Sequence, residues 1–134
     1  MMDLVQRSLD SASLSHKVIA DNIANVDTPG FKRSEVMFGE KLKQAFEARS
    51  NEPQHLAAAR TQAGHLAFEE TPDVETVQPE IKTDDSTSLR NDGNNVDIDR
   101  EMSLLAQNTV WYNTLAQITE QQFASLRSAI LEGK

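Results

Sequence analysis

The sequence contains no cysteine, which excludes a disulfide framework, a thiolate metal site and a cysteine nucleophile. Aromatic residues are scarce at 5%, and hydrophobic residues make up only 38% of the chain. Both values are low for a chain that fills a large core of its own. The 134 residues correspond to one domain.

Basic residues are also few, with 13 lysines and arginines against 21 acidic residues and a net charge of −8. Binding to duplex DNA needs clustered lysine and arginine to displace counterions. The composition therefore argues against a nucleic-acid-binding protein. Most of the negative charge lies in the middle of the chain, between Glu69 and Asp85, where we interpret it as a solvated surface.

No long apolar run is present. The segment after Met1 reads as an amphipathic helix, so we expect neither a Sec-type signal peptide nor a membrane span. If the protein leaves the cytoplasm, it does so by another route.

Signs of catalytic chemistry are lacking as well. The histidines at positions 16, 55 and 65 have no metal-ligand spacing, and His16 is expected to be a half-buried helix residue. The five glycines are scattered singly and form no phosphate-binding loop. We predict no catalytic residue, no metal, no cofactor and no enzymatic activity.

What the chain does contain is a long helical pattern at its C-terminus. Apolar or small residues recur there at alternating four- and three-residue intervals, as in the a/d seam of a coiled coil. This first stripe consists of Ile98, Met102, Leu105, Thr109, Tyr112, Ala116, Thr119, Phe123, Leu126 and Ile130. A helix over 97–131 would be about 50 Å long, whereas a globule of this size has a radius of gyration of about 14 Å. Part of the helix surface must therefore be covered by another helix or subunit.

A second stripe runs beside the first and comprises Leu104, Trp111, Leu115 and Ile118. Two stripes predict that the helix contacts neighbours on more than one side. The alternative is an ordinary long helix in a small bundle, with its wide face buried within the chain.

The start of the C-terminal helix is marked by a good N-cap, Asp97. Asp99 and Glu101 then place negative charge in the first turn, which the helix dipole favours. We interpret these three carboxylates as capping residues rather than as a catalytic cluster.

The N-terminus carries a weaker stripe of the same kind. It comprises Met2, Val5, Leu9, Ala12, His16, Ile19, Ile23 and Val26. The pattern ends at Asp27–Gly30, where Pro29 disfavours a helical residue before it.

The middle of the chain is less regular. It contains a short amphipathic helix over 39–49 with Leu42, Ala45, Phe46 and Arg49 on one face, then a helical turn or two over 54–62. A loop or weak β-ribbon is expected over 68–81, and a polar linker over 83–95. The predicted fold is all-α, with long N- and C-terminal helices as a coiled-coil-like pair. Its parts are an axial helix over 1–28, an irregular middle over 29–96 and a second axial helix over 97–134.

One segment is distinctive, and it reads Ala20-Asp-Asn-Ile-Ala-Asn-Val-Asp-Thr-Pro-Gly-Phe-Lys-Arg33. It resembles the N-terminal signature of the bacterial flagellar rod, hook and axial proteins. A second segment, Ser88–Met102, is similar to the stretch before the C-terminal helix in the proximal rod branch of that family. The signature residues are Asn22, Ile23, Ala24, Asn25, Thr28, Pro29, Gly30 and Phe31.

The local chemistry of the signature can be read from the residues. The amides of Asn22 and Asn25 can satisfy carbonyls at the helix end, and Ala24 is small enough to admit a neighbouring helix. Gly30 can take a positive φ, and Phe31 can then pack back on the helix.

The resemblance implies a structural subunit of the flagellar basal-body rod, located in the periplasmic rod. Such subunits are exported through the flagellar type III apparatus, assemble by helix packing, pass torque along the rod and leave a channel for export. The implied partners are further copies of the chain, FlgC-like rod subunits, and the adaptor FliE with the MS ring or export gate at the proximal end. A second hypothesis is a cytoplasmic coiled-coil adaptor or export chaperone.

Packing between subunits is expected to use the two stripes of the C-terminal helix and the end of the N-terminal one. The predicted interface residues are Ile19, Ile23, Met102, Leu104, Leu105, Trp111, Tyr112, Leu115, Ile118, Phe123, Leu126 and Ile130.

Overall fold

The computed structural model describes residues 2–51, 74, 76–85 and 90–132. Its elements are α1 (Met2–Ala24), β1 (Ser34–Val36), α2 (Gly39–Asn51), β2 (Ile81–Thr83) and α3 (Ile98–Glu132). They form two compact units: Met1–Met37 with Pro79–Lys134, and Phe38–Gln78. The mostly helical fold with a long helix at each end is the predicted one, and the expected small ribbon is present.

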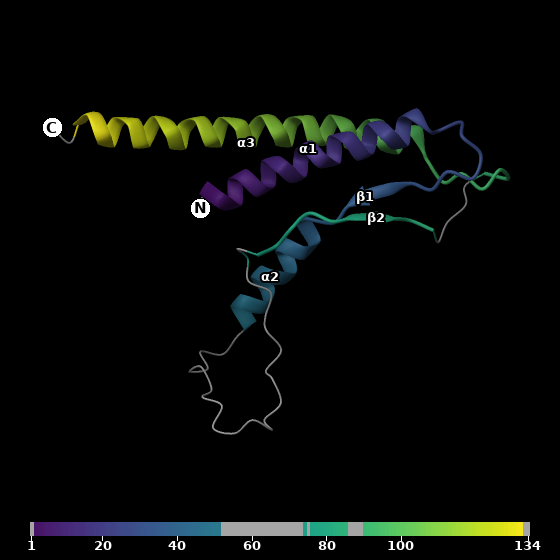
Figure 1. Ribbon diagram of the computed structural model, residues 1–134, viewed down its shortest axis with the longest axis horizontal. Coiled ribbons are helices and arrows are strands. Elements are labelled where there is room, and N and C mark those ends of the chain that lie inside the picture. The colour runs from purple at the N-terminus through teal and green to yellow at the C-terminus, as the bar shows by residue number, and fades with distance from the viewer. Residues whose placement is uncertain (1, 52–73, 75, 86–89, 133–134) are drawn as a thin grey trace, which may run out of the picture. The chain divides into compact units, whose positions relative to one another are not determined.

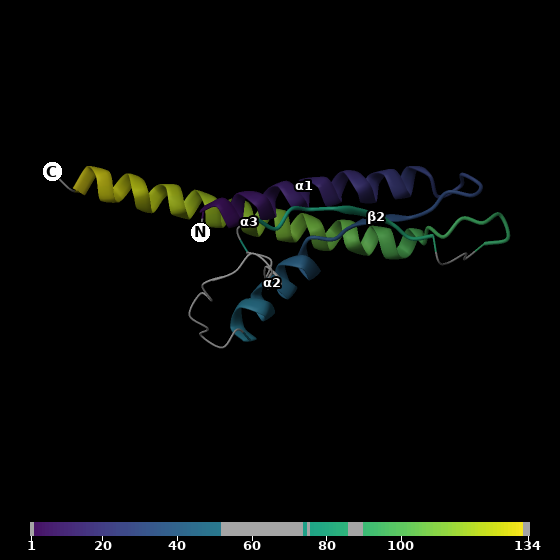
Figure 2. The ribbon, with the colours of Figure 1, turned by 60° about the horizontal axis from the view of Figure 1, so that its bottom comes forward.

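In the first unit, α1 and α3 pack side by side in opposite directions, and α3 continues past the N-terminal end of α1 (Figures 1 and 2). We call this pair the helical hairpin. It brings the C-terminal end of α1 next to the N-terminal end of α3. The strands β1 and β2 lie beside that end of the hairpin.

The face of α1 that α3 and β1 cover is built largely from small and polar side chains. Its buried residues are Ser8, Ser11, Ala12, Val18, Ile19 and Asn22. Small residues let two helix backbones approach closely. The buried face is rotated from the predicted stripe, so Met2 and His16 are exposed. The expectation that His16 is half-buried is therefore wrong for the isolated chain.

The inward line of α3 passes between the two predicted stripes. It includes Glu101, Leu104, Leu105, Asn108, Leu115, Thr119 and Gln122, which are buried or half-buried. The amide of Asn108 donates to the carbonyl of Ala12 on α1 at 2.9 Å. Because the inward line follows neither stripe, apolar residues of both stripes remain exposed.

Two residues of the first stripe have their polar groups satisfied within α3. The hydroxyl of Thr109 donates to the carbonyl of Leu105 at 2.8 Å, and that of Thr119 to the carbonyl of Leu115 at 2.9 Å. Such bonds to the preceding turn let threonine lie in an apolar stripe without a polar partner on another helix.

The sheet has two antiparallel strands, with Ser34 opposite Thr83, Glu35 opposite Lys82 and Val36 opposite Ile81. β2 lies at the boundary between the predicted weak ribbon over 68–81 and the predicted linker over 83–95, whereas β1 is not predicted. Three-residue strands carry almost no periodic signal, which explains why β1 was missed.

The second unit contains α2, which begins at Gly39 as predicted. Among the described residues of this unit, the buried ones are Phe38, Ala45, Val74 and Val77. Ala45 lies inward as expected, whereas Phe46 on the predicted apolar face is exposed. The side chain of Arg49 and the expected helical turn at 54–62 lie outside the described residues.

Within the described ranges, none of the helices combines the length and the apolar character that crossing a bilayer requires.

Candidate functional site

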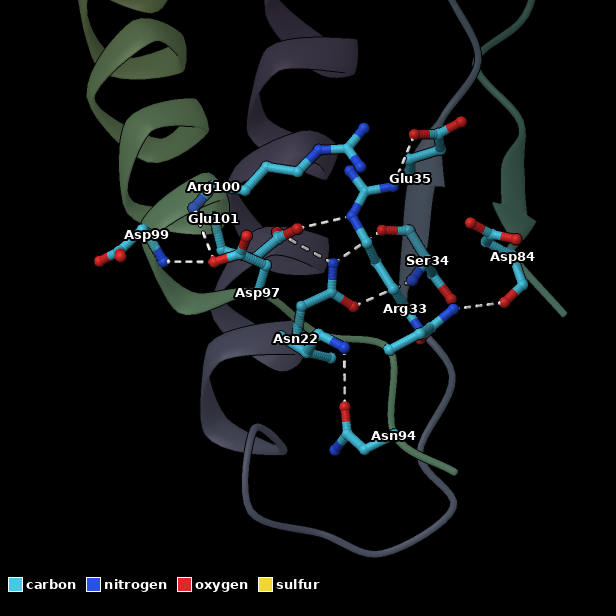
Figure 3. A network of polar contacts seen from close by, with 12 residues as sticks. Asn22, Arg33, Ser34, Glu35, Asp84, Asn94, Asp97, Asp99, Arg100 and Glu101 are labelled. Atoms are coloured by element: carbon cyan, nitrogen blue, oxygen red, sulfur yellow. Dashed lines mark hydrogen bonds and ion pairs between the residues drawn. The ribbon is translucent and has the colours of Figure 1, made fainter. Parts of the chain in front are cut away.

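The two sequence motifs meet where α1 ends and α3 begins (Figure 3). Five side chains hold this region together, and we call them the polar junction: Asn22, Arg33, Asn94, Asn95 and Glu101. All five are buried.

Asn22, on the last turns of α1, ties that helix to β1 and to α3. Its Oδ1 accepts a hydrogen bond from the backbone N–H of Ser34 at 3.0 Å, and its Nδ2 donates to the carbonyl of Ser34 at 2.7 Å. The same Nδ2 donates to Oε2 of Glu101 at 3.1 Å. The amide therefore pairs with β1 as a neighbouring strand would. The expectation that Asn22 caps its own helix is wrong.

Arg33 and Glu101 form a buried ion pair between the start of β1 and the first turn of α3. Nε of Arg33 donates to Oε1 of Glu101 at 2.6 Å, and Nη1 donates to Oε2 of Glu35 at 2.7 Å. The side chains of Arg33 and Glu101 are 5% and 0% exposed, whereas Glu35 is 41% exposed. Glu101 was interpreted as a capping charge, and the structure corrects this: it is the buried partner of Arg33.

Two opposing effects act on the pKa of the Arg33 guanidinium. Burial lowers this pKa, but hydrogen bonds to Glu35 and Glu101 and their negative charges outweigh burial and raise it above its ordinary value. A pKa raised by folding stabilises the folded state at every pH below the unfolded value, and the contribution is lost only as the pH rises through the folded pKa. Arg33 therefore remains charged throughout the physiological range.

Asn94 caps α1 from a distant part of the chain. Its Nδ2 lies within hydrogen-bonding distance of three carbonyl oxygens beyond the end of α1, those of Asn25 (3.0 Å), Val26 (3.1 Å) and Thr28 (2.9 Å). Its Oδ1 accepts from the N–H of Val96 at 2.7 Å. A single buried side chain thus adds a donor to three carbonyls of the turn that follows α1, each of which also accepts a hydrogen bond from Thr28, Arg90 or Phe31.

Asn95 forms hydrogen bonds to the segments that flank both strands of the sheet. Its Oδ1 accepts from the N–H of Arg33 at 2.6 Å, and its Nδ2 donates to the carbonyl of Asp84 at 2.7 Å. Asn95 thereby joins the residue before β1 to the residue after β2. Asn94 and Asn95 lie within the predicted polar linker, but both are buried and hold the elements together.

Two glycines allow the loops that carry these residues to approach each other. Gly30 has φ +73° and Gly93 has φ +83°, a region that side chains with a Cβ rarely occupy. The N–H of Gly30 donates to the carbonyl of Asp92 at 2.9 Å. The positive φ predicted for Gly30 is confirmed.

The remaining signature residues have more local roles. Nδ2 of Asn25 donates to the carbonyl of Asp21 at 2.8 Å, so the predicted capping by Asn25 is confirmed. Phe31 is half-buried, while Ala24, Thr28 and Pro29 are exposed.

Each polar side chain of the junction is directed at another part of the same chain, as Figure 3 shows, which suits a structural clamp rather than a reaction centre. Among the described residues, no group of three or more His, Cys, Asp or Glu side chains could hold a metal ion. An isolated buried ion pair adds little net stability, but it can fix the register of the elements that it joins.

The predicted interface residues fall into two groups. Ile19 and Leu115 are buried, and Ile23, Leu104 and Leu105 are half-buried. The others are exposed: Met102, Trp111, Tyr112, Ile118, Phe123, Leu126 and Ile130. Val110 and Leu131 are exposed as well and were not predicted.

Comparison with known proteins connects this geometry to a family. A model of the family described as flagella basal body rod protein matches residues 12–32. Flagellar basal body rod protein FlgB of Borrelia hermsii is 44% identical over 132 residues, which cover 96% of this chain and 94% of that protein. The chain belongs to the FlgB family.

Two further FlgB proteins agree over nearly the whole chain. FlgB of Borreliella burgdorferi is 36% identical over 93% of this chain and 91% of its own length. FlgB of Bacillus subtilis is 35% identical over 97% and 92%, respectively. The FlgB-like chain is a structural subunit of the flagellar rod and is located in the basal body. The relatives do not support a cytoplasmic adaptor or chaperone.

Part of the polar junction was not predicted from the sequence. Arg33, Asn94 and Asn95 all stand inside the two motifs that carried the resemblance. Their roles depend on contacts between residues more than 60 positions apart, such as Arg33 with Glu101. Two adjacent asparagines before an N-cap are the one local signal that could have indicated buried side chains.

Proposed function

We propose that this FlgB-family chain polymerises through the exposed apolar face of α3, transmits torque along the rod and lines the export channel. The supporting observation is that α3 extends beyond α1 (Figure 1) and that large apolar side chains of this helix are exposed. Phe123 is 57% exposed and Ile130 is 73% exposed. Large exposed apolar surfaces mark sites of protein association.

The polar junction supports the mechanical part of this proposal. It connects α1, β1, β2 and α3 through buried hydrogen bonds and one buried ion pair. A force applied to either helix is therefore passed directly to the other. In this proposal the helices within 1–28 and 97–134 are the axial parts, and the intervening 29–96 supply the junction loops and the smaller unit.

The partners that we propose follow from the family. They are further copies of the chain, FlgC-like rod subunits, and the adaptor FliE with the MS ring or export gate at the proximal end. Delivery is proposed to occur through the flagellar type III apparatus. We propose no catalytic role.

Deletion and complementation test the proposed function. Loss of the gene should remove the filaments and leave partial basal bodies, and the wild-type gene should restore both. A chaperone would behave differently, because its loss should deplete only its client. Normal filaments in the deletion strain would refute a rod subunit.

The substitution Phe123→Asp tests whether the exposed face of α3 is used. The side chain of Phe123 is exposed in the isolated chain, so the change should leave that chain folded. At an assembled interface it would bury an unpaired charge at a cost of about 4 kcal/mol, or about a thousandfold weaker association. We expect complemented cells to be non-motile, as measured by swimming in soft agar.

The matched control is Gln117→Asp, which adds the same charge at an exposed polar position of α3. Circular dichroism should show equal helix content in both variants. Leu105→Asp is less informative, because Leu105 is half-buried and its loss would also weaken the fold. Motile cells carrying Phe123→Asp would contradict the use of this face.

A further inference from the structure

The register of the two-stranded sheet determines which backbone groups face outward from β2. Antiparallel strands alternate between residue pairs that exchange backbone hydrogen bonds and pairs that do not. The N–H of Asp84 donates to the carbonyl of Arg33 at 2.8 Å, so this pair and every second pair along the strands are the bonded ones. The N–H and C=O groups of Ile81 and Thr83 therefore point away from β1, and both residues are exposed.

The two edges of the sheet differ in what covers them. On β1, the side-chain amide of Asn22 covers the edge at Ser34 and takes the place of a neighbouring strand. β1 lies between the helical hairpin and β2 (Figures 1 and 3), and within the first unit it is the only described element that β2 contacts. The edge of β2 therefore presents backbone donors and acceptors that a further strand can use.

The side chains of β2 restrict which strand can pair with this edge. The strand is short and carries Lys82 at its centre, two features that keep unrelated strands away from an exposed edge. Lys82 and Asp84 are two residues apart, so they lie on the same face, and both line one hollow. A partner strand is favoured when it places an acid opposite Lys82 and a base opposite Asp84. The segment 81–85 of a second copy has this pattern when it runs antiparallel to the first.

The possible registers of such a self-pair are not equivalent. Registers centred on Lys82 or on Asp84 place like charges opposite each other, which is unfavourable. A register centred on Ile81 places Thr83 opposite Pro79, which has no N–H to donate. In the register centred on Thr83, Lys82 of each copy faces Asp84 of the other, and no like charges among the described residues are opposite each other.

We propose that two copies of the chain pair along β2 in the register centred on Thr83, which joins their sheets into one four-stranded sheet. The charges across its centre then alternate in sign, because Glu35 on β1 is opposite Lys82, and Lys82 is opposite Asp84 of the second copy. Both outer edges of the larger sheet are edges of β1, each beside a helical hairpin. Pairing therefore stops at two copies.

This contact goes beyond the proposed rod contact of α3. A rod with a proximal and a distal end is directional, so its subunits all point the same way, whereas two chains paired along β2 are related by a two-fold axis. The β2 pair is therefore a form of the chain outside the rod. It shields, before assembly, a strand edge that unrelated chains could otherwise use.

A charge swap tests the proposed pair. The variants are made in the Phe123→Asp chain, whose expected loss of the α3 contact leaves β2 as the site of association. Lys82→Asp and Asp84→Lys each place two pairs of like charges across the contact, so we expect either variant alone to dimerise about tenfold more weakly than the Phe123→Asp chain. An equimolar mixture of the two should dimerise again, because both contacts then join opposite charges. Sedimentation equilibrium measures the dimer, and circular dichroism checks the helix content.

Cysteine substitution tests the register without a change of charge. The chain has no native cysteine, and the Cα atoms of a bonded antiparallel pair are about 5.5 Å apart, which a disulfide can span. Thr83→Cys should therefore form a linked dimer under mild oxidation. Ile81→Cys is the matched control on the same strand, because in this register its two copies are about 13 Å apart. It should link only when mixed with Asp85→Cys.

Four results would overturn the proposal. The Phe123→Asp chain could remain monomeric, the charge variants could dimerise as strongly as that chain, their mixture could fail to dimerise, or Ile81→Cys could cross-link alone as readily as Thr83→Cys. None of these results bears on the rod function, which the deletion strain and Phe123→Asp in cells test separately.

Discussion

At the scale of single residues, the junction depends on polar side chains that each bridge two or three separate segments. Asn22, Asn94 and Asn95 replace backbone partners that helix ends and short strands cannot supply to themselves. Arg33 and Glu101 place opposite charges at the centre of the same contact. Removing one member of such a network leaves buried groups without partners, which costs more than an intact bond contributes.

Glu101→Gln is expected to destabilise the chain strongly. The change removes the negative charge from a fully buried site and leaves Arg33 with the half-exposed Glu35 as its remaining carboxylate. Breaking a buried pair on one side costs about 3–5 kcal/mol. Urea unfolding followed by circular dichroism measures the loss. Glu35→Gln is the control and should cost less than about 1 kcal/mol, because its partner bond is exposed on one side. Equal losses would contradict the central role of Glu101.

Asn94→Ala is expected to loosen the end of α1. It leaves the three carbonyls of Asn25, Val26 and Thr28 without the donor that they share, and it removes the acceptor for the N–H of Val96. Each of the three carbonyls keeps a second donor, from Thr28, Arg90 or Phe31, so the N–H of Val96 is the buried group that loses its partner. An unsatisfied buried group costs about 1–3 kcal/mol, so we expect the free energy of unfolding to fall by about 2 kcal/mol in thermal unfolding. Asn91→Ala, at an exposed position of the same loop, is the control. A loss below about 0.5 kcal/mol for Asn94→Ala would show that water replaces the donor.

At the scale of elements, the long helices could be predicted because their periodic patterns extend over many turns. α3 was expected over 97–131 and begins at Ile98, with the backbone N–H of Asp99 donating to Oδ1 of Asp97 at 3.0 Å. Which face of each helix is buried could not be predicted, because the contact uses Ser8, Ser11 and Asn22 rather than the most apolar stripe. Polar side chains become suitable for a core only when their partners are known.

The strands and the junction could not be predicted for a related reason. β1 and β2 have three residues each, too few for an alternating pattern, and they pair across about 45 intervening residues. Buried Asn94 and Asn95 have the composition of a surface turn. The turn preference of asparagine predicts that both residues lie in an exposed linker. In the structure, contacts with distant segments bury them.

Amide hydrogen exchange should divide α3 into two parts in the dilute chain. Residues 101–115 pack against α1 and the junction, so their amides should be protected. The apolar side chains of residues 123–131 are exposed at the end of α3 that continues past α1, and helix ends open readily. This end of α3 should become protected on assembly. Uniform strong protection over 98–130 in the dilute monomer would contradict this account.

At the scale of the whole molecule, the chain combines a closed end with an open end. The junction closes one end of the hairpin with buried polar bonds, and the C-terminal end of α3 leaves apolar side chains exposed at the other. A rod subunit needs both, since the first keeps its helices in register and the second joins it to its neighbours. The low aromatic and hydrophobic content agrees with a subunit whose core is completed by assembly.

The most direct test is a density map of basal bodies from cells whose rod contains this chain, at a resolution that shows side chains. The account predicts α3 within the rod, with Trp111, Phe123 and Ile130 in contact with neighbouring subunits and the junction as in the isolated chain. A rod that lacks the chain, or one in which this face of α3 is open to solvent, would contradict it.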